Sequence, residues 1–343
     1  MKLEELVFDF NKVIVHPKFI ETVQEVSNLG VNNRGVNQGI SFDHEEYALI
    51  NGELVNTVGD IEQIKLKPDN ALLKKLERES ITAYDESITL FLSLEGSAYF
   101  TSHSLVLLSK NSYLPSNYLT FYFYTKSKTI TEKSHHIHLS EDVGIDSKKH
   151  YIKDRIHFLE NTVPNNSILL IDGPLIGGDV YTYMIQSIDK FHSRNIIPIF
   201  FVKNSGSNLV TNNISELQGK YNSDLHWSYN FLNPGTRSNF FIYQDRINPR
   251  NAKAFCYIKP YDLSPQRIEF HLDTFRKYNE RIPQLLDLVY YLILVQGNLK
   301  NPQIRPIAVA EMYARDTLKL LSTDALMKKI GIIPTMNQTR FGS

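Results

Sequence analysis

The chain has 343 residues, of which 42% are hydrophobic and 11% aromatic, a composition that supplies the core of one large or two ordinary globular domains. The 37 basic and 37 acidic residues balance. This balance excludes a global positive field, so any nucleic-acid site must be a local groove.

Cysteine and hydropathy patterns indicate a soluble, intracellular protein that we expect in the cytoplasm. Cys256 is the single cysteine and cannot form an intramolecular disulfide. The sequence starts without an apolar signal core, and no apolar run approaches the length of a membrane span. Cys256 lies in a strand-like segment without a nearby base, which favours a small buried residue over a nucleophile.

Residues 1–80 predict a mainly helical or irregular N-terminal extension. Residues 19–29 have a helical pattern, residues 28–39 are rich in Asn and Gly and predict a loop, and residues 69–79 predict an amphipathic helix. Three roles stay open for this extension: dimerisation, contact with a partner, and packing on a sheet.

The next segments predict a meander of antiparallel strands. Residues 88–94 and 98–108 are strand-like and flank a turn at 95–97, and residues 119–124 form another strand. Asp85 lies beside the first strand, where a half-buried carboxylate is a candidate cation ligand. The cluster of His135, His136 and His138 lacks cysteine partners and favours a polar surface over a zinc site.

A helix over residues 148–161 leads into the central feature of the chain, the apolar run at 168–171 that ends in Asp172. This run predicts a strand covered on both faces, and the carboxyl end of such a strand is where α/β sheets place their chemistry. Asp172 has two interpretations, a metal ligand or the start of an ordinary Asp-Gly-Pro turn. From the preceding helix, either Asp154 or Glu160 faces this site, and we favour Asp154.

Helical residues 179–193 and a second buried strand at 196–202 follow, which predicts a right-handed parallel crossover. Lys203 then stands at the same sheet edge as Asp172, where it either binds a phosphate or extends into solvent. The remaining segments predict a mixed sheet, with strands at 240–243, 255–258 and 267–272. They also predict a helix or extended segment at 224–232 and helices at 283–295 and 307–321. We expect one domain over residues 81–330.

Carboxylates from separate elements offer the oxygen ligands that Mn²⁺ or Mg²⁺ prefers. The candidates are Asp85, Asp154, Asp172 and Glu311. In phosphodiester hydrolysis, one such ion activates a water as the nucleophile and another stabilises the leaving oxygen. Lys203 could offset the negative charge that develops on the phosphate. A phosphate-binding loop, a dinucleotide fingerprint and a Gly-x-Ser-x-Gly elbow are all missing from the sequence.

The order of these segments resembles the NurA nucleases, over about residues 81–316. The resemblance rests on five segments: ILLIDGPL at 168–175, IIPIFFVKNSGS at 196–207, LNPGTRSNFF at 232–241, RIEF at 267–270 and PIAVAE at 306–311. It implies an RNase H-like mixed α/β sheet flanked by helices, a manganese-dependent deoxyribonuclease, a homodimer, and a partnership with a HerA-like hexameric ATPase.

The resemblance also implies roles for individual residues. Asp85 and Asp172 match the first and second metal aspartates of the family, and Lys203 matches its lysine after the following strand. Asp154 matches the family's helical glutamate, with Glu160 as the alternative. Two positions depart from the family: Glu86 replaces the glycine of its Asp-Gly-Ser motif, and Glu311 replaces its late histidine.

The resemblance therefore implies a metal-dependent DNA nuclease, a 5′–3′ exonuclease, a single-strand endonuclease or both, acting with a HerA-like ATPase in DNA end processing or defence. Arg237 and Lys259 are either DNA-backbone contacts or ordinary surface cations. One alternative is a catalytically silent docking subunit, which the two altered motifs motivate. Another is an RNase H-like enzyme that acts on RNA or is guided by a nucleic acid.

Overall fold

The computed structural model describes residues 10–28, 54–68, 79–109, 112–132, 136–175, 182–203, 207–245, 248–297 and 303–329. The predicted loop at 28–39 and helix at 69–79 lie almost entirely outside the described residues, as do His135 and residues 179–181 of the predicted helix at 179–193. Among the described residues, no helix is long and apolar enough to cross a membrane.

Five strands at the centre of the sheet have the RNase H-like arrangement. In chain order they are β4 (Ser80–Leu92), β5 (Ser97–Ser109), β6 (Ser112–Thr125), β8 (Ser167–Asp172) and β9 (Ile197–Val202). Their spatial order is β6-β5-β4-β8-β9, in which β5 is antiparallel to both neighbours and β8 is parallel to β4 and to β9. The predicted meander, the buried strand before Asp172 and the parallel crossover are confirmed.

Antiparallel strands extend this sheet beyond β9, so that the described strands form one mixed sheet of thirteen. The added strands are β13 (Gln266–His271), β12 (Ala252–Lys259), β11 (Phe241–Gln244) and β10 (Thr236–Ser238). At the other end, β7 (Ile137–Leu139) pairs with β6. The predicted mixed sheet is therefore confirmed.

The N-terminal region contributes edge strands that the sequence analysis did not predict. β1 (Lys12–Val15) pairs with β6, β2 (Leu54–Thr57) pairs with β11, and β3 (Gln63–Lys65) pairs with β10. Each strand has only three or four residues, too few for an alternating pattern to be distinguished from a loop. The predicted helix at 19–29 is present as α1 (Phe19–Asn28).

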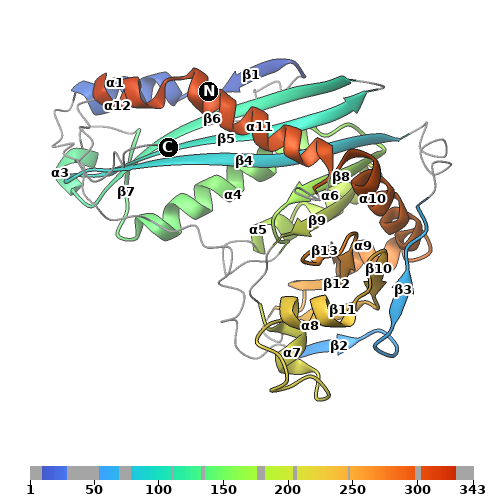
Figure 1. Ribbon diagram of the computed structural model, residues 1–343. Helices are drawn as coiled ribbons and strands as arrows, with labels where there is room; N and C mark the ends of the chain where they lie inside the picture. The colour runs from blue at the N-terminus through green and yellow to red at the C-terminus, as the bar shows by residue number, and fades with distance from the viewer. Residues whose placement is uncertain are drawn as a thin grey trace.

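Two long helices cover opposite faces of the sheet (Figure 1). On one face, α4 (Val143–Thr162) packs in a core with Tyr84 and Ile171, and on the other α11 (Arg305–Leu320) contributes Ile307 to a core with Ala83 and Leu170. Coverage on both faces explains the uninterrupted apolar sequence of β8. The other helices are α3 (Lys128–Thr131), α5 (Thr182–Ile185), α6 (Ile188–Ser193), α7 (Leu209–Asn213), α8 (Asp224–Phe231), α9 (Leu272–Lys277), α10 (Ile282–Gln296) and α12 (Thr323–Lys329).

Candidate functional site

Two of the predicted ligands, Asp85 and Asp172, lie side by side at the centre of the sheet. The parallel ladder between β4 and β8 runs to the pair Tyr84 and Ile171, and the next residue on each strand is an aspartate. Neighbouring strands are about 4.8 Å apart. Because side chains alternate along a strand, both aspartates point to the face that carries Ala83 and Leu170, which is the face covered by α11.

The electrostatics of this pair favour a bound cation. Asp85 is only 8% exposed. Burial raises its pKa well above the usual value, and the negative charges of Asp172 and then Glu86 add to this effect, while a hydrogen bond from the Glu86 N–H, at 2.8 Å, acts in the opposite direction. A divalent ion between the two carboxylates would relieve their repulsion and displace the proton from Asp85.

Lys203 reaches the same pair from β9. Its Nζ donates a hydrogen bond to Asp172 Oδ2 at 2.5 Å, and the two side chains are 33% and 17% exposed. Asp172 pairs with Phe201, so the lysine two residues later, immediately after the end of β9, points to the same face. The predicted proximity of Lys203 and Asp172 at one sheet edge is therefore present, with the ammonium group bound to the carboxylate.

Asp154 lies on the other face of the sheet. Its side chain is buried under α4 and accepts a 2.7 Å hydrogen bond from the hydroxyl of Tyr122 on β6. Burial raises its pKa to about 7, against the effect of the Tyr122 hydroxyl. The alternative residue, Glu160, forms a 2.8 Å ion pair with Lys190. The structure therefore brings neither residue of α4 to the aspartate pair.

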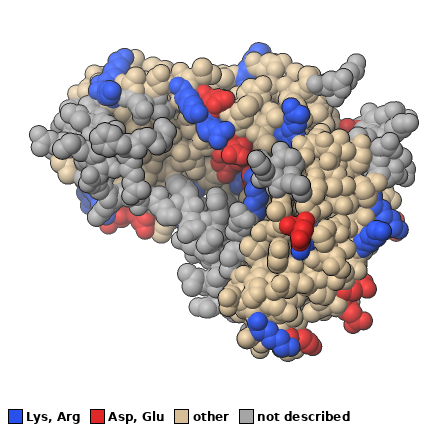
Figure 2. All heavy atoms as spheres, in the orientation of Figure 1, with Lys and Arg blue, Asp and Glu red and all other residues tan. Residues whose placement is uncertain are grey.

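Glu311 lies on α11 and thus on the same side of the sheet as the aspartate pair. Its carboxylate is 3.7 Å from Arg315, and both side chains are about half exposed. Figure 2 shows acidic and basic side chains gathered along α11 and toward the centre of this face. Among the described residues, however, no group of three or more His, Cys, Asp or Glu side chains is arranged to hold a metal ion.

The two aspartates nevertheless fit a divalent ion. Mg²⁺ and similar hard cations often bind one or two carboxylates and complete their coordination with water and substrate phosphate. Asp85 and Asp172 supply such a pair, and the ammonium group of Lys203 lies against it, bound to Asp172. Asp85, Asp172 and Lys203 are therefore the residues that the structure brings together.

Glu86, the residue that departs from the family motif, points away from this pair. It follows Asp85 on β4, so it lies on the α4 face, where its carboxylate accepts a hydrogen bond from the hydroxyl of Tyr151. A glutamate is accommodated at this position because α4 supplies a donor for it.

Gly173 turns the chain immediately after Asp172. Its φ of +96° lies in a region that disfavours side chains, although no atom lies within 4 Å of the Cβ that a substitution would add. We expect Gly173→Ala to lower the free energy of unfolding by about 1–2 kcal/mol and to shift Asp172. Denaturant unfolding and Mn²⁺ affinity measure the two effects.

Gly219 provides the matched control for this substitution. It also has a positive φ, +69°, and has no atom within 4 Å of an added Cβ, but it lies outside the elements that carry the aspartates. Gly219→Ala should lower stability by a similar amount and leave Mn²⁺ affinity unchanged. Equal effects of the two substitutions on metal affinity would contradict the assigned role of the Gly173 turn.

Arg237 and Lys259, the two candidate DNA contacts, are not surface cations. Both side chains are buried, and Arg237 Nη1 donates to Ser238 O at 2.8 Å. The Lys259 ammonium group lies 4.0 Å from the centre of the Tyr229 ring and 3.0 Å from Asp262. These interactions occupy both cations within the fold.

A group of buried charged side chains beside this site was not predicted from the sequence. Lys253 on β12 and Arg267 and Glu269 on β13 are all fully buried and bound to one another. Charged residues alternate with apolar ones in β13, a pattern that normally indicates a solvent-exposed face. The only hint of these buried charges in the sequence was the RIEF segment at 267–270, in which Arg267 and Glu269 are the polar positions. Both face a side of the sheet that is covered.

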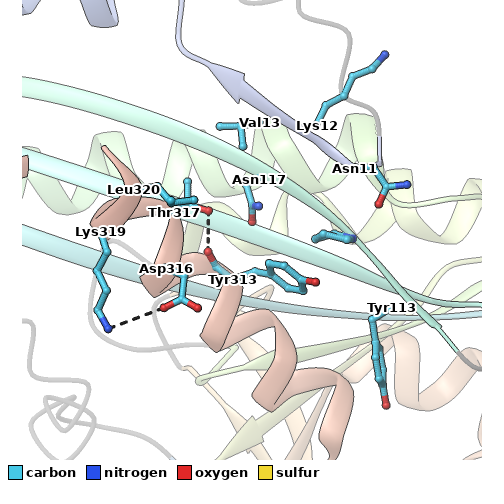
Figure 3. Close-up of a pocket in the computed structure, with 11 residues that line it drawn as sticks. Asn11, Lys12, Val13, Tyr113, Asn117, Tyr313, Asp316, Thr317, Lys319 and Leu320 are labelled. Carbon is cyan, nitrogen blue, oxygen red and sulfur yellow. Dashed lines mark hydrogen bonds and ion pairs between the residues drawn. The ribbon is translucent and has the colours of Figure 1, made fainter. Parts of the chain in front are cut away.

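A separate pocket of about 760 Å³ lies between β1, β6 and the outer part of α11 (Figure 3). Tyr113, Asn117 and Tyr313 line it, together with the apolar side chains of Val13 and Leu320. The charged side chains drawn there include Asp316 and Lys319, which are 3.8 Å apart and neutralise each other. The aspartate pair does not line this pocket, so the two features are distinct.

Comparison with known proteins gives a family match and distant structural similarities. The family model of the NurA domain matches residues 153–316. A crystal structure of the NurA nuclease from Sulfolobus solfataricus is similar over 80% of this chain and 89% of its own, at 12% identity and a TM-score of 0.47. A crystal structure of NurA with manganese is similar over 79% and 93%, at 10% identity and a TM-score of 0.36.

An Argonaute from A. aeolicus is similar over 71% of this chain and 28% of its own, at 12% identity and a TM-score of 0.31. No curated protein matches the sequence. The family match includes Asp172 and Lys203, whereas Asp85 precedes it. Residues 153–316, just under half of this chain, are therefore similar to the NurA domain.

Proposed function

We propose that this protein is a metal-dependent nuclease that hydrolyses phosphodiester bonds in DNA. The observation that carries the proposal is the juxtaposition of Asp85, Asp172 and Lys203 on an RNase H-like sheet in a chain with a NurA domain. We further propose Mn²⁺ as the metal, with Mg²⁺ as the alternative, and cleavage as a 5′–3′ exonuclease or a single-strand endonuclease.

Each residue of this group has a distinct task in the proposed reaction. Asp85 and Asp172 would hold the ion, which supplies Lewis acidity and an activated water when bound. Asp85 releases its proton as the cation binds, because its raised pKa originates from burial and the neighbouring negative charges. Lys203 moves from Asp172 to the scissile phosphate, where a point charge stabilises the developing negative charge.

Cleavage of labelled linear and circular single-stranded DNA with Mn²⁺, Mg²⁺ or EDTA tests this proposal. We expect metal-dependent cleavage by wild type and a loss of at least about 100-fold in Asp172→Asn, because the metal site and its electrostatic contribution are removed. Labels at the 5′ and 3′ ends report polarity, and the circle reports endonuclease activity. Matched RNA strands test the alternative of an RNA-directed enzyme.

Asp189 offers a matched control for this substitution. It is an exposed aspartate that forms a 2.9 Å ion pair with Arg250 at the surface. Asp189→Asn removes the same charge as Asp172→Asn and should leave cleavage unchanged. Equal losses of cleavage in both variants would remove the reason for placing Asp172 in the site.

We also propose that the protein is a homodimer that acts with a HerA-like ATPase, as the family resemblance suggests. A near-neutral chain is consistent with a partner that delivers the DNA, since it has no global positive field of its own. Light scattering of the purified protein tests the dimer. Co-elution with a HerA-like ATPase, and stimulation of cleavage by it in the presence of ATP, tests the partnership.

A second candidate function is a catalytically silent subunit that docks on such an ATPase. It is favoured by one observation, that the described residues contain no group of three metal-ligating side chains. A silent subunit predicts no cleavage with any metal, with or without the ATPase, while binding to the ATPase remains. Mn²⁺-dependent cleavage that is lost in Asp172→Asn excludes this candidate.

A further inference from the structure

A network of buried charged side chains lies on β12 and β13, beside β9 in the same sheet and close to the chain that carries Asp172 and Lys203. Glu269 Oε1 accepts hydrogen bonds from Lys253 Nζ at 2.7 Å and from Arg267 Nε at 2.8 Å, and all three side chains are at most 1% exposed. Burial alone would raise the pKa of Glu269, but the charges of Lys253 and Arg267 hold it below its usual value. Glu269 is therefore an anion inside the protein.

The second oxygen of Glu269 fixes the loop after β8. Glu269 Oε2 accepts a 2.9 Å hydrogen bond from the backbone N–H of Leu175, a fully buried residue three positions after Asp172. Between them, the Gly173 N–H donates to Phe201 O on β9 at 2.8 Å. The chain that leaves Asp172 is thus attached to both β9 and β13.

Arg267 binds Ser207, which follows β9 in the chain. Its Nη1 donates a 2.6 Å hydrogen bond to Ser207 Oγ, four positions after Lys203. Ser207 Oγ also contacts Asp224 Oδ2 at 3.2 Å, and Asp224 Oδ1 accepts the backbone N–H groups of Val210 and Thr211 at 3.0 and 2.9 Å. Asp224 is fully buried, so the start of α7 is also attached to this network.

We propose that Glu269 and Arg267 are positioning residues that fix Asp172 and Lys203 relative to each other, an inference that rests on the proposed nuclease function. One guanidinium–carboxylate pair on β13 binds both Leu175, which follows β8 in the chain, and Ser207, which follows β9. Lys253 supplies the second positive charge that the buried carboxylate requires, and Asp224 balances the network. Groups that orient metal ligands typically contribute about 10- to 100-fold to metal affinity or activity.

Two substitutions test this inference at different points of the network. Glu269→Gln keeps an acceptor for Leu175 but removes the charge that binds Lys253 and Arg267. Ser207→Ala removes only the hydroxyl that connects Arg267 and Asp224, so it should fold even if Glu269→Gln does not. Ser207→Thr retains the hydroxyl and serves as the rescue variant.

The first measurement is amide hydrogen exchange at Leu175, Val210 and Thr211. We expect faster exchange at Leu175 in Glu269→Gln and at Val210 and Thr211 in Ser207→Ala, with wild-type rates in Ser207→Thr. Phe19→Ala, in a separate core beside β5 and β6, is a destabilised control that should leave these amides unchanged. Wild-type exchange at these amides in folded Glu269→Gln and Ser207→Ala would overturn the inference.

The second measurement is the steady-state kinetics of DNA cleavage with Mn²⁺. We expect kcat to fall about 10- to 100-fold in Glu269→Gln with little change in KM for DNA, and less in Ser207→Ala. If wild type cleaves DNA and both folded variants match its kcat, the inference fails while the nuclease proposal stands. If wild type does not cleave but exchange responds as expected, the nuclease proposal fails and the network retains its role in holding the two segments.

Discussion

Asp85→Asn is expected to make the metal-free protein more stable and, at the same time, to abolish its response to Mn²⁺. In the folded protein Asp85 is buried and close to Asp172, and both effects raise its pKa, whereas the unfolded chain ionises it freely. At neutral pH the Asp85 carboxylate therefore lowers the stability of the folded protein, and the uncharged amide of Asn removes this destabilisation. The same change removes one of the two proposed metal ligands.

Wild type should gain about 3 kcal/mol in unfolding free energy at a free Mn²⁺ concentration of about 100 times Kd, because the ion binds only the folded state. Denaturant unfolding with and without Mn²⁺ measures both quantities. Asp172→Asn should also lose the metal response, but without the gain in stability, since it gives up its ion pair with Lys203. That pair is partly exposed, so its loss costs little.

Substitutions at the other predicted ligands separate the possible metal sites. From their positions in the structure, we expect Asp154→Asn and Glu311→Gln to keep the Mn²⁺ response, because Asp154 lies under α4 and Glu311 binds Arg315. Loss of the response in either variant would show that the metal-bound protein gathers ligands that are apart in this structure. An Asp85→Asn protein that is less stable and still responds to Mn²⁺ would contradict the assigned site.

The second large effect concerns Asp154 and pH. Burial raises its pKa from 3.8 to about 7 in the folded protein, so between these values the folded state holds a proton that the unfolded state has released. The contribution of Asp154 to the free energy of unfolding is therefore complete below its pKa in the unfolded chain. It is lost as pH rises through its pKa in the folded protein. Relative to wild type, Asp154→Asn should gain stability with rising pH, by at most about 4 kcal/mol.

The comparison with wild type at each pH is essential, because burial also lowers the pKa of His16 and His138 to about 4. These histidines produce the opposite trend, since their stabilising contribution grows as pH rises, but they are present in both proteins. Urea unfolding at about pH 4.5, 6 and 7.5 covers the titration of Asp154. A constant difference between the two proteins across this range would refute the raised pKa.

Asp146→Asn is the matched control on the same helix. A hydrogen bond from Ser140, at 2.8 Å, is the largest cause that lowers the pKa of Asp146. A lowered pKa gives stability that is present above the unfolded pKa and lost as pH falls. Asp146→Asn should therefore be slightly less stable than wild type near neutral pH, the opposite sign to Asp154→Asn.

The sequence predicted those parts of the fold whose patterns are local and strong. The apolar runs of β8 and β9, each ending in a charged residue, gave the parallel crossover and placed Asp172 and Lys203 at one edge. The position of Asp85 beside them depends on the pairing of β4 with β8, for which the family resemblance supplied the only argument.

Sequence reasoning was weaker where rotation or burial of an element decides the outcome. Asp154 was expected to face Asp172, but α4 packs on the other side of the sheet, and helical periodicity contains no information about which face a helix covers. Arg267 and Glu269 occupy polar positions of an alternating strand, so nothing local indicated that both would be buried and bound to Ser207 and to the backbone of Leu175.

The parallel pairing of β4 and β8 also has a consequence for the order of events during folding. The meander of β4, β5 and β6 forms from neighbouring hairpins. In contrast, the ladder of β4 with β8, which brings Asp85 next to Asp172, joins distant residues such as Thr82 and Ile168, which are 86 positions apart in the sequence. Contacts of such long sequence separation close a large loop and form slowly. A nascent chain that has completed only the meander therefore has one aspartate of the proposed cation site, and we expect metal binding only after β8 has paired with β4.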